Sequence, residues 1–165
     1  LEKIQLESAV FRAVEKANAE MLELLLERIE EADDYRLGKF QELLYKVSTY
    51  GAWFGHAAVV DVAMKMDPLP DPEDWIWFGQ QWLIEAVVDG FHDVVKVLLD
   101  QGVPPDVESE RGCTALALAT GTGATIIAKL LLDAGADPGA QRCNGMPAVS
   151  CRHCFALAPK SPEFR

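Results

Sequence analysis

The chain has 165 residues, half of them hydrophobic, and a formal net charge of −11. This length predicts one domain, and this composition is sufficient for a continuous hydrophobic core. The acidic balance disfavours nucleic-acid binding, which needs Lys and Arg to replace counterions, and it disfavours an anionic membrane surface. The sequence contains no uninterrupted apolar run of about 18 residues, so no membrane-spanning helix is expected.

Two further features of the sequence bear on the cellular compartment. No basic segment followed by an apolar one opens the chain, so no secretory signal is visible. The four cysteines do not form the dense pattern of a disulfide scaffold. Both features favour a cytoplasmic or nuclear protein. The chain begins at Leu1 rather than at methionine, which is compatible with a trimmed or internal fragment.

The first predicted unit is a helix–turn–helix at about residues 5–37, with Ala17 at the turn. Acidic residues crowd the end of this unit: Glu27, Glu30, Glu31, Asp33 and Asp34. Such a charge run is typical of a solvated helix end, and the alternative is a docking patch for a basic partner.

The second predicted unit occupies about residues 38–74, and its second helix begins in the segment from Gly55 to Met64. Gly55 and Gly90 lie 35 residues apart, and Ala17 and Gly55 lie 38 apart. Both spacings exceed the 33 residues that separate corresponding glycines further along the chain. Such differences are consistent with loop insertions in a repeat array.

A fixed spacing of 33 residues begins at Gly79. It separates Gly79, Gly112 and Gly145, and also Gly90 and Gly123, Gly102 and Gly135, and Pro105 and Pro138. The segment Val97–Asp100 recurs in similar form as Leu130–Asp133. This regularity predicts a stack of similar units rather than a globule around one catalytic cleft.

Each unit is predicted to contain a helix, a tight turn, a second helix and a projecting loop. The apolar run from Trp82 to Val88 predicts a first helix. Gly90 ends it, because glycine accepts the left-handed conformation of a helix end. The second helix has one apolar face, formed by Val94, Val95, Leu98 and Leu99.

These units resemble the ankyrin repeat, which has a period of 33 residues and a first helix that opens with Thr-Pro-Leu-His-x-Ala. The match is closest between Gly112 and Gly123. There Thr114, Leu116 and Ala119 agree, while Ala115 replaces the proline and Ala117 replaces the histidine. The resemblance is clearest over residues 79–150. It implies an all-α ankyrin-repeat solenoid of about four helix–turn–helix repeats with a C-terminal half-repeat cap.

The predicted division is a single ankyrin-repeat domain over residues 1–158, followed by a flexible tail at 159–165. The repeats lie at about 5–37, 38–74, 75–108 and 109–141, and the cap at 142–158. In the cap, Arg152 stands where a repeat has a packed alanine. A polar residue there suits an end repeat, which has no further neighbour to pack against.

Neither a metal nor a cofactor is expected. Cys143, Cys151, His153 and Cys154 could in principle supply four zinc ligands. Only one Cys-x-x-Cys pair is present, and it falls within a predicted helix, so ordinary half-buried cysteines are favoured. The sequence also lacks a nucleophile elbow, a phosphate-binding loop and a metalloprotease motif. We therefore assign no catalytic residue and favour a protein without catalysis.

In ankyrin-like stacks, partners usually contact a concave groove formed by loop tips and by the exposed ends of the first helices. The resemblance places an aromatic set, Trp53, Phe54, Trp77 and Phe78, between the second and third units. It places a second set downstream, formed by Val88, Asp89, Glu110, Arg111 and Thr122. Trp77 and Phe78 are expected in a loop before Gly79, and Trp82 is expected to pack between helices.

Two interpretations of the aromatic set are balanced. Exposed aromatic patches frequently mark binding sites, whereas an irregular second unit could bury the same rings in its core. We expect a monomeric protein–protein interaction module whose peptide or protein partner has some basic character. The alternative is a small-molecule-binding or enzymatic variant with an aromatic and acidic cavity. That cavity would use Trp53 and Trp77 beside His56, Asp71, Glu73 and Asp74.

Overall fold

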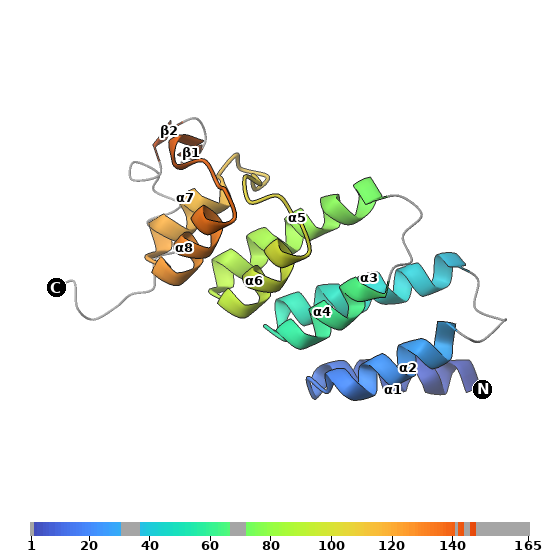
Figure 1. The fold of residues 1–165 in the computed structure, drawn as a ribbon. Coiled ribbons are helices and arrows are strands. Elements are labelled where there is room, and N and C mark those ends of the chain that lie inside the picture. Colours follow the sequence, from blue (N-terminus) through green and yellow to red (C-terminus); the bar gives the residue numbers. More distant parts are fainter. Residues whose placement is uncertain (1, 31–36, 67–71, 141, 144–145, 148–165) are drawn as a thin grey trace. The chain divides into compact units, whose positions relative to one another are not determined.

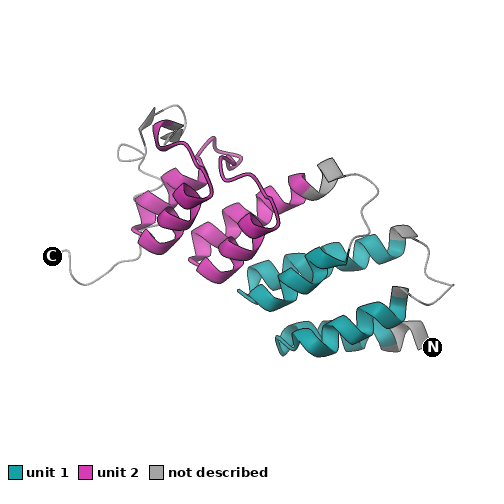
Figure 2. Cartoon of the chain, in the orientation of Figure 1, with its two compact units in different colours: residues 1–75 teal, residues 76–165 magenta. Residues whose placement is uncertain are grey.

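The computed structural model describes residues 2–30, 37–66, 72–140, 142–143 and 146–147. Within these ranges the chain forms eight α-helices, one short 3-10 helix and two strands of two residues each (Figure 1). The helices follow one another as pairs joined by tight turns. The chain divides into two compact units, residues 1–75 and residues 76–165 (Figure 2). The prediction of an all-α chain built from helix–turn–helix pairs is confirmed.

The first unit contains two helix pairs. They are α1 (Glu2–Glu15) with α2 (Ala19–Glu30), and α3 (Leu37–Trp53) with α4 (Ala57–Lys65). Helix α1 packs against α2 and α3, and helix α4 packs against the same two helices. The two pairs therefore enclose one hydrophobic core.

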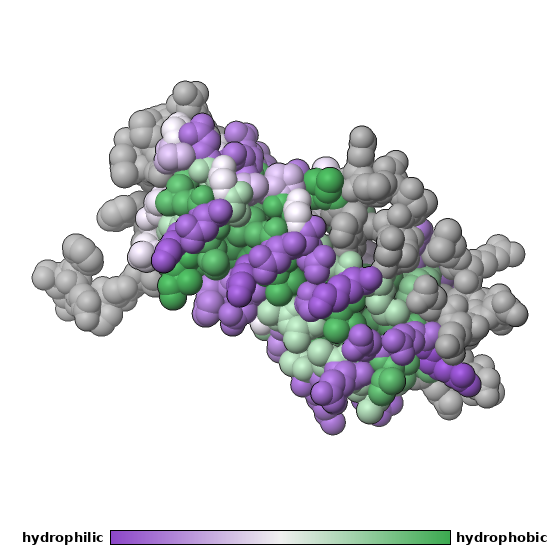
Figure 3. Space-filling view, in the orientation of Figure 1, coloured by the Kyte–Doolittle hydropathy of each residue, from purple (hydrophilic) through white to green (hydrophobic). Residues whose placement is uncertain are grey.

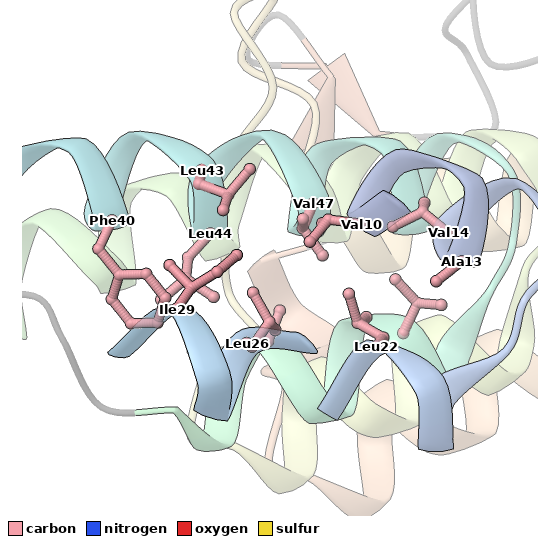
Figure 4. Packing of buried hydrophobic residues seen from close by; sticks show 12 residues of the cluster. Val10, Ala13, Val14, Leu22, Leu26, Ile29, Phe40, Leu43, Leu44 and Val47 are labelled. Atoms are coloured by element: carbon pink, nitrogen blue, oxygen red, sulfur yellow. The ribbon is translucent and has the colours of Figure 1, made fainter. Parts of the chain in front are cut away.

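Aliphatic side chains from all four helices meet in this core (Figure 4). It is formed by Val10, Ala13, Val14, Leu22, Leu26, Ile29, Phe40, Leu43, Leu44, Val47, Val59 and Ala63. On α2, the fully buried residues Leu22, Leu26 and Ile29 follow the spacing of one helical face. The amphipathic pattern of the sequence therefore determines which side of α2 faces the core.

Gly51 allows α3 and α4 to approach each other closely. A Cβ atom at this position would lie 2.9 Å from Val60 Cγ2 and 3.0 Å from Val59 Cγ1. Both valines are fully buried, and β-branched side chains have few alternative rotamers. The observed packing of these two helices therefore requires glycine at position 51.

The second unit contains most of α5 and the elements that follow it. The helices are α5 (Pro72–Asp89), α6 (His92–Asp100), α7 (Ala115–Thr122) and α8 (Thr125–Asp133). Helix α8 packs against both α6 and α7. After α8 come the 3-10 helix η1 (Pro138–Ala140) and the antiparallel strands β1 (Arg142–Cys143) and β2 (Met146–Pro147).

Helix α5 is longer than predicted from the sequence. It begins at Pro72, whereas the predicted first helix began at Trp82, after a loop that contained Gly79. Proline is favourable in the first turn of a helix, so Pro72 starts α5 rather than preventing it. Gly79 lies inside the helix, where a Cβ atom would lie 2.7 Å from Val103 Cγ2. This glycine therefore permits a close side-chain contact and does not mark a loop.

The turns between paired helices have left-handed backbone where the sequence predicted it. The φ angles are 72° at Gly55, 81° at Gly90 and 73° at Gly123, and Ala17 has φ 50° at the corresponding turn of the first pair. An L-residue with a Cβ atom is strained in this conformation. Ala17 therefore occupies a position that glycine would fill with less strain.

Replacing Ala17 by glycine is expected to raise the free energy of unfolding by about 0.5–1 kcal/mol, because the relief of strain exceeds the added freedom of the unfolded chain. The matched change Gly123→Ala should lower it by about 1 kcal/mol. No atom lies within 4 Å of a Cβ built at Gly123, so backbone strain alone is tested there. Urea unfolding followed by circular dichroism measures both changes. A loss of stability in Ala17→Gly would contradict the left-handed turn at Ala17.

The predicted cap and tail lie largely outside the described residues. Only the short strands β1 and β2 and the residues before them are described in this part of the chain. The helix expected around Cys151 and Cys154, and the tail at 159–165, belong to the part that is not described. The division into one domain, four repeats and a cap stays a prediction.

Candidate functional site

Exposed aromatic side chains gather where α3 ends in the first unit. Trp53 is the last residue of α3 and is 53% exposed, and Phe54 follows it and is 59% exposed. The ring of Tyr50, one turn earlier, lies 6.1 Å from the Phe54 ring and 6.2 Å from the Trp53 ring, measured between centroids. Trp53 and Phe54 are therefore surface residues and not part of the core.

Two further rings extend this group. Phe11 of α1 meets Tyr50 edge to face at a centroid distance of 5.7 Å, and His56 stacks on Phe54 at 6.1 Å. We name these residues the unit 1 aromatic cluster: Phe11, Tyr50, Trp53, Phe54 and His56. Tyr50 was not among the residues predicted from the sequence, although its spacing of four residues from Phe54 indicates a shared helix face. Phe11 could not be found this way, because its contact depends on the packing of α1 against α3.

A charged pair lies on α3 next to this cluster. Lys46 Nζ donates a hydrogen bond to Glu42 Oε1 at 2.6 Å, four residues earlier on the same helix. This hydrogen bond lowers the pKa of Glu42 below its ordinary value and raises the pKa of Lys46. The Lys46 charge is thus matched by a neighbouring carboxylate and adds little net positive charge beside Tyr50.

In the second unit, Trp77 and Phe78 lie within α5 and not in a loop as predicted. Trp77 is 57% exposed, whereas Phe78 is half-buried. The Trp77 and Phe78 rings meet edge to face with centroids 5.1 Å apart, and Phe78 stacks on Trp82 at 6.3 Å. Trp82 is buried, which confirms the prediction that it packs inside the fold. Phe78 therefore joins the exposed Trp77 ring to a buried one.

The predicted convergence of the four aromatic residues stays a prediction. Trp53 and Phe54 belong to the first unit, and Trp77 and Phe78 belong to the second. The cavity alternative also stays a prediction, because the side chains of its acidic residues, Asp71, Glu73 and Asp74, lie outside the described part of the structure.

Three residues of the downstream set line one pocket in the second unit. Val88 of α5 and the loop residues Glu110 and Arg111 surround a volume of about 300 Å³. Helix α5 adds Ile84 and Glu85, and α7 adds Leu118. We name this hollow the α5–α7 pocket. It combines an apolar wall with charged groups. This combination suits a side chain that has an apolar stem and a polar end.

The other two residues of the downstream set lie differently. Asp89 ends α5 and is exposed. Thr122 is only 9% exposed, and its single hydroxyl hydrogen is shared between the carbonyl oxygens of Leu118 and Ala119, which lie 3.0 and 3.2 Å from Oγ1. Thr122 therefore has little side-chain surface for a partner, because its hydroxyl is already used inside α7.

Apolar side chains are also exposed on a second helix of this unit. Figure 3 shows hydrophobic surface over α8, crossed by hydrophilic side chains. The large exposed hydrophobic residues of α8 are Ile126, at 62%, and Leu132, at 43%. Exposure alone therefore does not distinguish the aromatic residues of α3 and α5 from other surface positions.

Among the described residues, no group of three His, Cys, Asp or Glu side chains could hold a metal ion. The zinc candidates Cys151, His153 and Cys154 lie outside those residues, as does the side chain of Cys143. Cys113, which is not one of these candidates, is fully buried and disulfide-bonded.

Comparison with known proteins identifies the family. A family model of ankyrin repeats, in three copies, matches residues 13–142. The chain belongs to the ankyrin-repeat family. An ankyrin repeat-containing protein of Treponema pallidum (strain Nichols) is 38% identical over 73 residues, which make up 44% of this chain and 24% of that protein. The predicted family and all-α ankyrin fold class are confirmed, and the number of repeats stays a prediction.

Ankyrin repeats generally mediate protein–protein interaction. In the described ranges of this ankyrin-repeat chain, no helix has both the length and the apolar character needed to cross a bilayer. The aligned segment spans about a quarter of the length of the Treponema relative. Protein–protein interaction is thus the general role of the family to which this chain belongs.

Proposed function

We propose that this ankyrin-repeat chain binds a peptide or protein partner through the exposed side of its first helices, with aromatic side chains as anchors. The observation that supports this surface is that Trp53, Phe54 and Trp77 are not only exposed but lie against further aromatic rings. Each of these side chains is more than half exposed, although each is large and apolar. Tryptophan and tyrosine are enriched among the residues that contribute most to binding energy at interfaces.

The unit 1 aromatic cluster provides a continuous surface for such an anchor. Tyr50 and Phe54 stack with an angle of 11° between their rings, and Trp53 lies beside them at 60° to Tyr50. Aromatic side chains bury large areas on association and also pair favourably with one another. A bulky apolar side chain of the partner would therefore find several ring surfaces at one place.

The proposed surface also includes contacts in the second unit. Trp77 and Phe78 would add apolar contacts, and Val88, Asp89, Glu110 and Arg111 would add contacts further along the chain. The net charge of −11 favours a partner with basic character, because complementary charge steers association and disfavours acidic competitors. Thr122 is not included, because it is nearly buried.

Replacing Trp53 or Trp77 by alanine is expected to weaken partner binding about tenfold or more. It should lower the free energy of unfolding by no more than about 1 kcal/mol, because each exposed ring loses one contact with a neighbouring ring. The partner can be a peptide selected from a random displayed library against the full chain. Fluorescence anisotropy of the labelled peptide then gives the dissociation constant for each variant. Urea unfolding gives the stability of the same variants.

The matched control is Ile126→Ala on α8. Ile126 is as exposed as the two tryptophans but lies on a second helix, so its replacement should leave peptide binding unchanged. The proposal would be wrong if both tryptophan variants bound the peptide like the wild type. It would also be wrong if only Ile126→Ala weakened binding, because the binding surface would then include α8 and not the first helices.

A further inference from the structure

The α5–α7 pocket has an apolar wall built from two helices. Ile84 and Val88 are separated by four residues on α5, so they point to the same side of that helix. Leu118 of α7 is buried and completes the wall. A volume of about 300 Å³ lies at the lower end of the range for ligand pockets, so it suits one side chain rather than a large ligand.

Charged groups lie at the edge of the same pocket. Glu85 follows Ile84 on α5, and Glu110 and Arg111 come from the loop before α7. All three are exposed. Two carboxylates and one guanidinium give a local formal charge of −1, which matches the sign of the net charge of the chain.

An occupant with an apolar stem and a cationic end is complementary to both parts. Lysine and arginine bury their methylene stems against apolar surface while the charged head stays near water and near acidic groups. A purely apolar occupant would gain nothing from the carboxylates. An acidic occupant would be repelled by two of the three charged groups.

We infer that the α5–α7 pocket receives a lysine or arginine side chain of the bound partner. The stem packs on Ile84, Val88 and Leu118, and the cationic head lies near Glu85 and Glu110. This inference rests on the proposed function, since it specifies one residue of the partner. It can nevertheless be tested without the partner.

The test is a titration of the full chain, labelled with ¹⁵N, with three small probes of similar length: n-pentylammonium, 1-pentanol and pentanoate. Amide chemical shifts locate the binding site and give the affinity of each probe. We expect pentylammonium to shift amides of residues 81–88 and 109–118 and to bind at least about threefold more tightly than pentanol. Pentanoate should bind most weakly of the three.

Charge variants test the roles of the individual groups. The double variant Glu85→Gln with Glu110→Gln should bind pentylammonium no better than pentanol. Arg111→Gln should bind pentylammonium more tightly than the wild type, because it removes the opposing cation. The control Asp100→Asn with Asp133→Asn removes the same charge from the ends of α6 and α8, and it should retain the wild-type preference.

Several results would overturn the inference. Equal affinity for the three probes would show an apolar hollow without charge selection. Shifts confined to other residues, or wild-type behaviour of the double glutamine variant, would exclude Glu85 and Glu110 as recognition groups. If the probes bind here as expected while peptide binding is insensitive to Trp53 and Trp77, the proposed aromatic surface fails and the pocket assignment stands. If peptide binding depends on Trp53 and Trp77 while the probes do not bind at the α5–α7 pocket, the aromatic surface stands and the pocket assignment fails.

Discussion

Replacing Leu26 by alanine is expected to lower the free energy of unfolding by about 3 kcal/mol. Leu26 is fully buried at the middle of α2, in the core that α1, α2, α3 and α4 share. The cost has two parts, namely the lost transfer of the removed methyl and methylene groups from water and the cavity that remains. The surrounding side chains come from four helices, so the cavity can close only in part.

Urea unfolding followed by circular dichroism measures this loss. The control is Leu24→Ala on the same helix, because Leu24 is 61% exposed and should change the stability by less than about 0.5 kcal/mol. Both variants have the same helix propensity change, so their difference isolates burial. A loss below about 1 kcal/mol for Leu26→Ala would place this side chain outside a close-packed core.

Replacing Gly51 by alanine is expected to lower the free energy of unfolding by about 2 kcal/mol, even though alanine is the better helix former. By propensity alone, alanine inside α3 would stabilise the chain by about 1 kcal/mol. The new methyl group would overlap Val60 Cγ2 and Val59 Cγ1, so α3 and α4 would have to separate. The sign of the change therefore shows whether propensity or helix packing dominates at this position.

A second substitution tests the contact itself. Val60→Ala removes Cγ2, the atom nearest to the new methyl group. The double variant Gly51→Ala with Val60→Ala should therefore lose less stability than the sum of the two single changes, by about 1 kcal/mol. Strict additivity would mean that Gly51 and Val60 do not meet in solution. A stabilising effect of Gly51→Ala alone would exclude the close approach of the two helices.

The turns were predictable from the sequence because they depend on local chemistry. Gly90 and Gly123 stand at the same place in the 33-residue period, and glycine is favoured at left-handed positions. Ala17 was identified as a turn residue from the helix–turn–helix pattern of the residues around it, without a glycine to mark it. Backbone geometry at these turns therefore follows from one residue and its register.

The start of α5 was not predictable in the same way. Gly79 has the register of a loop glycine, but it lies inside α5, where the absence of a Cβ atom leaves room for the Val103 side chain. That contact joins residues 24 positions apart, so neighbouring residues do not reveal it. The period therefore assigned Trp77 and Phe78 to a loop, although they continue the helix.

Side-chain exposure could not be predicted from the repeat pattern either. Thr122 and Asp89 were both assigned to the groove by their register, yet Thr122 hydrogen-bonds within α7 and is nearly buried, whereas Asp89 is exposed. For Trp53 and Phe54 the sequence left core and surface equally open. Exposure depends on which helices pack against a residue, and this is determined by tertiary contacts rather than by register.

The extension of α5 changes how Trp77 would take part in association. A tryptophan on a mobile loop would have to order its backbone when a partner binds, at a cost of roughly 1–2 kcal/mol for each residue fixed. Trp77 lies on a helix, so that conformational entropy has already been lost during folding. Calorimetry of a complex centred on Trp77 should therefore show a smaller entropic penalty than a loop-borne anchor would give.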